Sequence, residues 1–345
     1  MGLKEAVKDR ILILDGALGT MIQKYGLSET DFRGERFAHL PGQQRGNNDL
    51  LVLSRPEVIR EIHTRYLEAG ADIIETCTFN SQSISLADYH CESLVKEINF
   101  AAAQLARTCA DNYATPEKPR FVAGSVGPTN KTCSLSPDVN DPALRTLHFD
   151  ELAIAYQEQI EALLEGGVDA ILIETVFDTL NAKAAVVAAQ AAMSTKGREV
   201  PIMLSVTVAD KGGRTLSGQT LEAFLASFST MPIFSVGLNC SFGAKDMKPF
   251  LENLAARAPY YISVYPNAGL PNSLGEYDET PEHMASEVAE FLDENLINIV
   301  GGCCGTTDKF IAEYPKLLEG RTPHRPVAVP SCLWLSGLES CEIRP

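Results

Sequence analysis

Three cysteines in two distant segments have positions that suit a metal site. Cys303 and Cys304 stand side by side between glycines, directly after the apolar run 297–300. Cys240 ends a second apolar run, 234–239, in the same way. Neighbouring side chains of a strand point to opposite faces, so both sulfurs of the pair can face one site only where the strand ends and the backbone bends, which glycine permits. Because a disulfide between neighbours would be strained and thiolates suit Zn²⁺, we predict that all three cysteines bind zinc.

Two other interpretations of these cysteines remain open from the residues alone. Buried cysteines are common in protein cores without any chemical role, although a pair and a separate cysteine that all stand at strand ends favour a metal. The cysteines could also form a structural zinc site or a redox-sensing thiol cluster. That alternative predicts a closed fourth coordination position.

An open zinc site with three thiolate ligands suits sulfur chemistry. Its fourth tetrahedral position is free, and the site carries a net charge of about −1. Such a zinc ion generates hydroxide poorly but deprotonates a bound thiol, and the thiolate is the reactive form in sulfur chemistry. The reaction class that we predict is attack by a zinc-bound substrate thiolate on an electrophilic carbon.

Apolar runs and amphipathic segments alternate along the chain. Strands that are apolar throughout and alternate with helices indicate a parallel sheet covered on both faces. Eight such units favour an α/β fold closed into a single (β/α)8 TIM barrel over an open doubly wound sheet. No Gly-x-Gly-x-x-Gly sequence follows the first run, which weakens a dinucleotide-binding fold further. The expected strands are residues 11–14, 71–76, 121–127, 170–174, 202–207, 234–240, 260–266 and 297–302, and the expected helices are 4–9, 56–68, 91–112, 149–164, 181–192, 221–229, 246–257, 281–294 and 307–319.

We expect the barrel to span residues 1–320 and a C-terminal arm or linker to span 321–345. Prolines punctuate the arm, as is typical of an extended linker. Its prolines include Pro323, Pro326 and Pro330. Within the barrel, a polar stretch at about residues 22–55 separates the first strand from the next helix. A loop of this length is unusual in a compact domain and is often functional.

Composition limits the kinds of partner. The chain has 345 residues, 45% of them hydrophobic and 21% charged, which is enough for a large packed core. Its net charge of −16 argues against nucleic acid and against an anionic membrane surface as partners. No run is long enough to span a bilayer, and the N-terminus shows no secretory pattern. Nine cysteines in such a chain predict reduced thiols and a cytoplasmic location.

Polar side chains end nearly every expected strand, where the chemistry of a barrel is located. Most carboxylates are solvated or cap helices, but acidic and thiol groups that converge on one mouth favour a function for Asp15 and Glu174. The same evidence leaves Glu75 and Thr207 undecided. Two carboxylates would bind a substrate ammonium group, and the backbone N–H groups of residues 16–19 would bind a carboxylate. Thiol, amine and carboxylate together describe a small thiol amino acid.

Motifs at these strand ends resemble those of the zinc-dependent homocysteine S-methyltransferases. They are the segments 15–21, 75–79, 127–130, 174–175, 237–240, 266–269 and 301–305. The resemblance implies a catalytic zinc ion on Cys240, Cys303 and Cys304, with homocysteine as the substrate.

The same resemblance implies a set of substrate-binding residues. We expect the homocysteine amino group near Asp15 and Glu174 and its carboxylate on the backbone around Gly16 and Ala17. Asn267 would lie beside the metal and could fill the fourth position when homocysteine is absent. The candidate substrate-binding residues are therefore Asp15, Gly16, Ala17, Glu174, Thr207 and Asn267.

Four further stretches resemble the N-terminal module of cobalamin-dependent methionine synthases specifically. They are residues 31–37, 46–51, 136–142 and 335–339. This narrower resemblance implies that the methyl group comes from methylcobalamin, and ultimately from 5-methyltetrahydrofolate. The chain contains no Asp-x-His-x-x-Gly cobalamin signature, so a cobalamin- and folate-binding module would supply the donor, in cis or as a separate subunit. The alternative is direct transfer from S-methylmethionine or betaine.

Cys77 departs from the family pattern, because relatives usually carry Asn in the Glu-Thr-x-Thr-Phe motif. We interpret this extra thiol as a harmless packing variant rather than an oxidation liability. The remaining cysteines match no ligand position and are expected to be structural. They are Cys91, Cys109, Cys133, Cys332 and Cys341.

Overall fold

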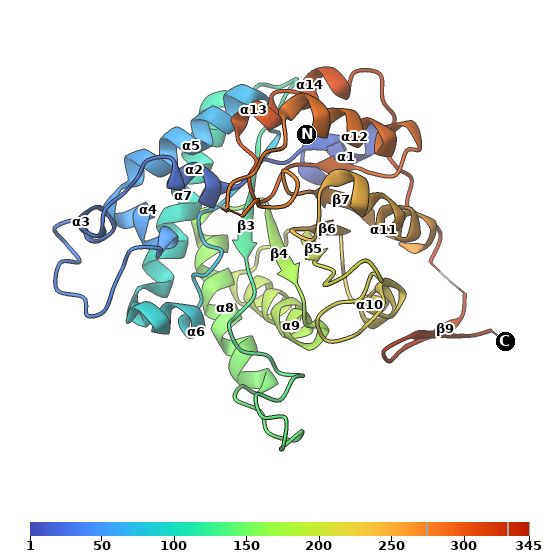
Figure 1. Ribbon diagram of the computed structural model, residues 1–345, viewed down its shortest axis with the longest axis horizontal. Helices are drawn as coiled ribbons and strands as arrows, with labels where there is room; N and C mark the ends of the chain where they lie inside the picture. Colours follow the sequence, from blue (N-terminus) through green and yellow to red (C-terminus); the bar gives the residue numbers. More distant parts are fainter. Residues whose placement is uncertain (274, 330, 345) are drawn as a thin grey trace.

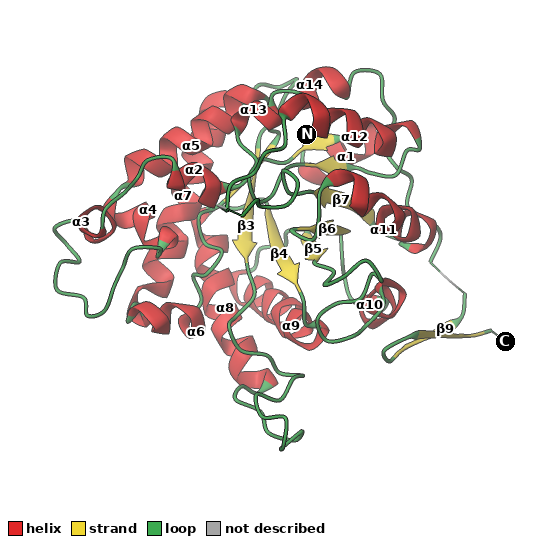
Figure 2. Cartoon of the chain, viewed as in Figure 1, coloured by secondary structure: helices red, strands yellow, loops and turns green. Residues whose placement is uncertain are grey.

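Eight parallel strands form the centre of the molecule, and helices surround them (Figure 1; Figure 2). The computed structural model describes residues 1–273, 275–329 and 331–344. The strands are ordered β1-β8-β7-β6-β5-β4-β3-β2 in the sheet. Their bounds are β1 (Leu12–Ile13), β2 (Ile73–Glu75), β3 (Phe121–Val126), β4 (Ala170–Val176), β5 (Ile202–Val206), β6 (Ser235–Asn239), β7 (Tyr261–Tyr265) and β8 (Ile299–Val300).

The sheet closes between its first and last strands in this order. A parallel bridge joins Leu14, just after β1, to Ile73 of β2. Two backbone hydrogen bonds support it: Asp15 N–H donates to the Ile73 carbonyl at 3.0 Å, and Asp72 N–H donates to the Ile13 carbonyl at 2.7 Å. The predicted (β/α)8 barrel is therefore confirmed.

Helices follow the strands and cover their outer faces (Figure 2). In α5, proline occupies the first turn, and Gly70 ends the helix at a φ of +111°, which glycine adopts at little cost. None of the described helices is both long and apolar enough to cross a membrane. The α-helices are α1 (Leu3–Asp9), α2 (Leu18–Gln23), α3 (Glu29–Arg33), α4 (Leu51–Ser54), α5 (Pro56–Ala69), α6 (Ser83–Leu86), α7 (Val95–Tyr113), α8 (Phe149–Gly166), α9 (Thr179–Lys196), α10 (Leu221–Phe228), α11 (Ala244–Arg257), α12 (Pro281–Asp293), α13 (Asp308–Ile311) and α14 (Tyr314–Leu317).

Two segments differ from the expected elements. Residues 307–319 form the short helices α13 and α14 rather than one helix, and Pro315 lies in the first turn of α14. Proline lacks a backbone N–H and its ring collides with the preceding turn, so it is disfavoured inside a helix and tolerated in the first turn of a new one. The stretch 22–55, expected as a loop, contains α3, α4 and the 3₁₀ turn η1 (Asn48–Leu50).

The barrel interior is filled by side chains at every second position of the strands. These inward residues include Leu12, Leu14, Ile73, Phe121, Ala123, Ala170, Leu172, Met203, Tyr265 and Ile299. Ile171 and Ile173, which alternate with them, belong to the larger core between sheet and helices. The strand period of two carries the inward series on to Glu75 after Ile73 and to Glu174 after Leu172. The fold therefore aims polar groups into the barrel mouth.

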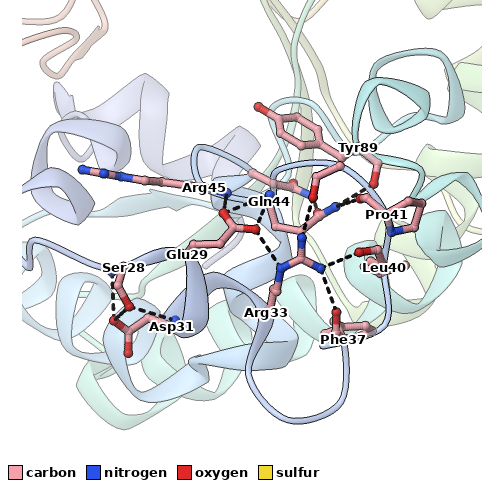
Figure 3. A network of polar contacts seen from close by, with 12 residues as sticks. Ser28, Glu29, Asp31, Arg33, Phe37, Leu40, Pro41, Gln44, Arg45 and Tyr89 are labelled. Carbon is pink, nitrogen blue, oxygen red and sulfur yellow. Dashed lines mark hydrogen bonds and ion pairs between the residues drawn. The ribbon is translucent and has the colours of Figure 1, made fainter.

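A compact polar network orders the segment after α2 (Figure 3). The Glu29 carboxylate accepts hydrogen bonds from Arg33 Nε at 2.7 Å and from the backbone N–H of Gln44 at 2.8 Å. The Gln44 side chain in turn donates to the carbonyl of Tyr89 at 2.8 Å. The network fixes the chain that leads into η1, and η1 reaches the barrel mouth.

The C-terminal arm contains an antiparallel hairpin that the sequence analysis did not anticipate. β9 (Leu333–Ser336) pairs with β10 (Ser340–Ile343), and the hairpin packs against α10. Ser336 Oγ donates to the carbonyl of Ala223 in α10 at 2.7 Å. This contact attaches the end of the arm to the barrel.

The arm combines prolines, which are typical of linkers, with a sequence that favours a strand. The Leu-Trp-Leu-Ser sequence at 333–336 is rich in residues that favour strands, and Gly337 follows it. Pro330, one of the prolines named above, lies outside the described residues. The role of residues 321–345 as a linker to a further module stays a prediction.

Candidate metal and substrate site

A cavity of about 650 Å³ opens at the C-terminal ends of the strands. Its walls come from α2, η1, the loop after β2 and the loops after β7 and β8. Of the residues singled out from the sequence, it is lined by Gly16, Ala17, Glu75, Glu174, Cys77, Cys240, Cys303 and Cys304. Residues to which the sequence analysis gave no individual role also line it, among them Asn48, Phe79, Thr175, Tyr265 and Tyr277.

The three predicted zinc ligands meet at this cavity. The Sγ atoms of Cys240 and Cys304 lie 3.5 Å apart, and those of all three cysteines lie within 4.8 Å of one another. A tetrahedral zinc ion with Zn–S bonds of about 2.3 Å separates its sulfur ligands by roughly 3.8 Å. The donor set and its spacing therefore fit zinc. A second group of potential ligands lies at the start of α12 and consists of Glu279, His283 and Glu287.

Close packing shapes the loop that carries the cysteine pair. The N–H of Cys303 donates to the carbonyl of Pro266 at 2.7 Å. Thr306 Oγ1 donates to the carbonyl of Cys303 at 2.7 Å, and a Cβ atom at Gly302 would lie 2.5 Å from that same Oγ1. Only glycine fits there, which explains why the pair is preceded by glycine.

A tight turn presents the third thiol. Cys240 has a φ of +58°, which is uncommon for a residue with a side chain. Thr207 Oγ1 lies 3.2 Å from Ser241 Oγ, and Ser241 Oγ accepts a hydrogen bond from the N–H of Val208 at 2.8 Å. Thr207 thus contacts the turn that holds Cys240 and is not among the described residues that line the cavity.

The three thiols hold their protons unequally. Hydrogen bonds from Cys240 and Cys303 lower the pKa of Cys304 to about 3. Hydrogen bonding with Cys240 and Cys304, together with burial, raises the pKa of Cys303 well above its usual value. The group thus holds one thiolate stabilised by neighbouring thiols. A soft dication would replace the remaining protons, because zinc binds cysteine as thiolate.

Three carboxyl groups lie at the same mouth. Glu75 and Glu174 line the cavity, whereas Asp15 is 1% exposed and is not among the described lining residues. Asp15 Oδ2 accepts a hydrogen bond from the N–H of Glu75 at 3.0 Å, and Asp15 Oδ1 has no partner among the described residues. The Ser125 hydroxyl donates to Glu174 Oε1.

Burial raises the pKa of all three carboxyl groups. It raises the pKa of Glu174 to about 7 and the pKa values of Asp15 and Glu75 well above their usual range. The negative charges of Glu174 and Asp15 raise the pKa of Glu75 further. A substrate cation would compensate the remaining negative charge, so the arrangement suits an ammonium group.

The backbone near Gly16 forms part of the cavity wall. A Cβ atom there would lie 2.9 Å from the Tyr66 ring, so only the bare backbone fits. The N–H of Ala17 already donates to Thr306 Oγ1 at 3.2 Å. Asn267 is 6% exposed, its Oδ1 has no partner among the described residues, and it is not among those that line the cavity.

Sequence reasoning gave no role to Asn239 or Thr175. The buried Asn239 side chain accepts hydrogen bonds from Thr175 N–H at 3.1 Å and the Ser205 hydroxyl at 2.6 Å, and donates to Thr175 Oγ1 at 2.8 Å. Its Nδ2 lies 3.9 Å from Cys303 Sγ. Asn239 thereby ties three strands to the cysteine loop and supports Thr175, whose φ is +55°. Its position directly before Cys240 was the available signal.

Cys77 is 5% exposed and lies near the wall formed by η1. Its thiol donates to the carbonyl of Asn48 at 3.5 Å. Burial and the nearby Asp49 carboxylate raise the pKa of Cys77 well above its usual value, which keeps it in the thiol form. All nine cysteines of the chain are free of disulfides.

Comparisons with known proteins extend over nearly the whole chain. A family model described as homocysteine S-methyltransferase matches residues 12–318. The metallated form of the homocysteine methyltransferase MmuM from Escherichia coli superposes with a TM-score of 0.68 at 22% identity, covering 89% of this chain and 96% of that one. The apo form of the same protein gives a TM-score of 0.63 at 23% identity, covering 90% and 97%. At these identities the structural likeness supports the shared fold alone.

Proposed function

The chain belongs to the homocysteine S-methyltransferase family and is a methyltransferase, and we propose that it methylates the thiol of homocysteine with methylcobalamin as the methyl donor. The observation that carries the proposal is the meeting of three thiols and two carboxyl groups at one cavity. When bound by Cys240, Cys303 and Cys304, zinc would lower the pKa of the substrate thiol.

The carboxyl groups would bind the amino end of homocysteine. Glu174 lines the cavity and has a second oxygen beyond the one that accepts from Ser125. Asp15 holds an unpartnered, buried oxygen at the same mouth, and an ammonium group would supply the missing donor. Both groups therefore support the proposed role in substrate orientation.

The other end of homocysteine would contact the backbone around Gly16, which lines the cavity. No Lys, Arg or His is found among the described residues that line the cavity, so backbone N–H groups are the available donors for a carboxylate. We propose that Thr207 stabilises the turn that holds Cys240. Asn267 stays a candidate for the fourth zinc position.

Methylcobalamin as donor rests on the segment that contains η1. Residues 46–51, which resemble cobalamin-dependent methionine synthases, include Asn48 and Asp49 of the cavity wall. The cavity volume of about 650 Å³ suits an amino acid, and a cobalamin, which is larger than a drug-sized ligand, would approach the bound thiol at the cavity mouth. The cobalamin- and folate-binding modules would act in cis or as a separate subunit.

A second candidate is direct transfer from a small cationic donor, S-methylmethionine or betaine. The acidic lining with no basic residue among its described members favours a positively charged group. For either reaction we propose a cytoplasmic location, because nine cysteines suit a compartment that keeps thiols reduced.

The deciding experiment incubates the zinc-loaded protein with homocysteine and one donor at a time. We expect methionine to form with methylcobalamin and not with S-methylmethionine or betaine. Turnover with S-methylmethionine and none with methylcobalamin would establish the second candidate. X-ray absorption at the zinc edge should show one additional sulfur ligand when homocysteine is added, and an unchanged spectrum would indicate a structural or redox site instead.

A further inference from the structure

Glu75 occupies a position at the cavity that the proposed function does not yet use. It is the last residue of β2, and its inward direction follows from the alternation of the strand. Its carboxyl group lines the cavity together with that of Glu174. Among the residues that the sequence suggested for substrate binding, Thr207 and Asn267 are not among the described residues that line the cavity, whereas Glu75 is.

Glu75 lies near the two other carboxyl groups. Its backbone N–H donates to Asp15 Oδ2 at 3.0 Å, and it lines the same cavity as Glu174. Ser125 donates to Glu174 from the next strand over. The backbone of Glu75 therefore holds Asp15 in place, whereas its side chain adds a further carboxyl group near Glu174.

The arrangement of these carboxyl groups is unfavourable without a cation. Glu174 is 5% exposed, and Asp15 Oδ1 has no donor among the described residues. Neighbouring carboxyl groups repel each other when both are ionised, and no basic side chain stands among the described residues of the cavity wall. Burial, with the charges of Glu174 and Asp15, raises the pKa of Glu75 well above its usual value. A cationic ligand would remove this conflict.

We propose that Glu75 is a specificity-determining residue that, with Asp15 and Glu174, forms a three-carboxyl site for the ammonium group of the substrate. An ammonium group has three N–H donors, which three carboxyl groups can accept. The site would select thiols that carry an amino group over thiols that lack one. This inference rests on the proposed function, because it names how the same cavity chooses its thiol substrate.

The test compares L-homocysteine with 4-mercaptobutanoate, which has the same thiol and carboxylate but no amino group. Dissociation constants of both thiols are measured by calorimetry on the zinc-loaded wild type and on Glu75→Gln. Glutamine keeps the length of the side chain and the backbone N–H to Asp15. We expect the preference for homocysteine to fall by at least about tenfold, since hydrogen bonds to charged groups are among the stronger ones. In turnover, KM for homocysteine should rise while kcat changes little.

Asp49→Asn is the matched control. Asp49 is another buried carboxylate of the cavity wall, but its Oδ2 already accepts hydrogen bonds from Asn80 N–H at 2.7 Å and from Ser81 Oγ at 2.8 Å. Removal of its charge should leave the ratio of the two dissociation constants unchanged. An equal fall of the ratio in both variants would assign the effect to general charge and overturn the proposal.

Two other results would show whether the role of Glu75 or the proposed function itself is wrong. If the wild type prefers homocysteine and Glu75→Gln keeps the same preference, Glu75 has no role in selection. If the zinc-loaded wild type binds neither thiol, the proposed function itself is wrong. Should Glu75→Gln fail to fold by circular dichroism, Glu75→Met, of similar length and without charge, is measured in its place.

Discussion

The Sγ atoms of Cys240 and Cys304 lie 3.5 Å apart although 64 residues separate them in the sequence. One follows β6 and the other follows β8, and β7 lies between these strands in the sheet. The ends of parallel barrel strands meet at one rim, so residues distant in sequence become neighbours there. The distance leaves space for an ion that both sulfurs contact.

Removal of one of these thiols should separate metal binding from folding. We expect Cys304→Ala to lose zinc and methyl transfer while the barrel remains folded, because Cys304 lies at the mouth and outside the described core clusters. Zinc content by elemental analysis and far-UV circular dichroism measure the two effects. Global unfolding of the variant would contradict the placement of the site.

A variant in the second group of potential ligands, Glu279, His283 and Glu287, is the control for zinc binding. His283 Nδ1 lies 2.8 Å from Glu279 Oε1, near the start of α12. His283→Ala should keep the tightly held zinc. Loss of that zinc in the histidine variant would mean that the cysteines are not the site.

A neutral side chain at position 174 should separate substrate binding from metal binding. We expect Glu174→Gln to weaken homocysteine binding, because the amide cannot supply a negative charge to the ammonium group. The zinc content should stay the same, since Glu174 is not among the proposed ligands. Loss of zinc from this variant would assign Glu174 a different role.

The pH dependence of stability should reveal the buried carboxyl group of Glu174. Its pKa is about 7 in the folded protein against 4.5 as an ordinary value. Between these values the folded protein binds more protons than the unfolded chain, so the free energy of unfolding falls as pH rises. The loss from this group is at most about 3 kcal/mol. Urea unfolding at pH 4.5 and pH 8 measures the free energy of unfolding of both proteins. Relative to the wild type, Glu174→Gln should become more stable by up to that amount as the pH rises. An equal change in both proteins would contradict the raised pKa of Glu174.

The residues around this cavity show which features of the site the sequence predicts and which it does not. The meeting of the three cysteines was predictable because each stands at the end of an apolar strand and the ends of barrel strands meet at one rim. Glu75 stayed undecided, although its inward direction follows from Ile73 two residues earlier. That Asp15 touches the substrate stays a prediction, and the contact of its Oδ2 with the N–H of Glu75, which follows from the closure of β1 on β2, was not foreseen.

Other features depend on tertiary contacts that no local pattern reveals. The φ of +55° at Thr175 is held by the side chain of Asn239 from another strand. The hairpin at the C-terminus needs α10 as its support, and α10 is more than a hundred residues away. Such features require the assembled barrel before they can be recognised.

Replacement of Asn239 should therefore weaken the site, because its side chain holds residues of the neighbouring strands in place. Asn239→Ala removes hydrogen bonds to Thr175 and Ser205, and leaves buried groups without partners. We expect a loss of about 2–4 kcal/mol in unfolding free energy, since each unpaired buried group costs about 1–3 kcal/mol. Zinc affinity should fall as well, because Cys303 loses a neighbour that lies 3.9 Å from its sulfur. Unchanged zinc affinity would limit Asn239 to a structural role.

The C-terminal hairpin should detach before the barrel unfolds. Trp334 is the chain's one tryptophan, and it packs against the main core from β9. We expect its fluorescence to change at a lower urea concentration than far-UV circular dichroism. Ser336→Ala removes the hydrogen bond to Ala223, worth about 1 kcal/mol, and should lower only the fluorescence midpoint. Coincident transitions for both signals would show that hairpin and barrel unfold as one unit.

Alkylation of the zinc-free protein should distinguish the thiols of the cavity. Cys304, partly exposed with a pKa of about 3, is ionised at pH 6, whereas an ordinary cysteine is less than about 1% thiolate at that pH. Cys77 is buried, and its pKa is raised. We expect limiting N-ethylmaleimide to modify Cys304 first and Cys77 last, and zinc to protect Cys304, as followed by peptide mass spectrometry. Because alkylation requires an accessible thiolate, modification of Cys77 as fast as Cys304 would make Cys77 an oxidation liability rather than a harmless packing variant.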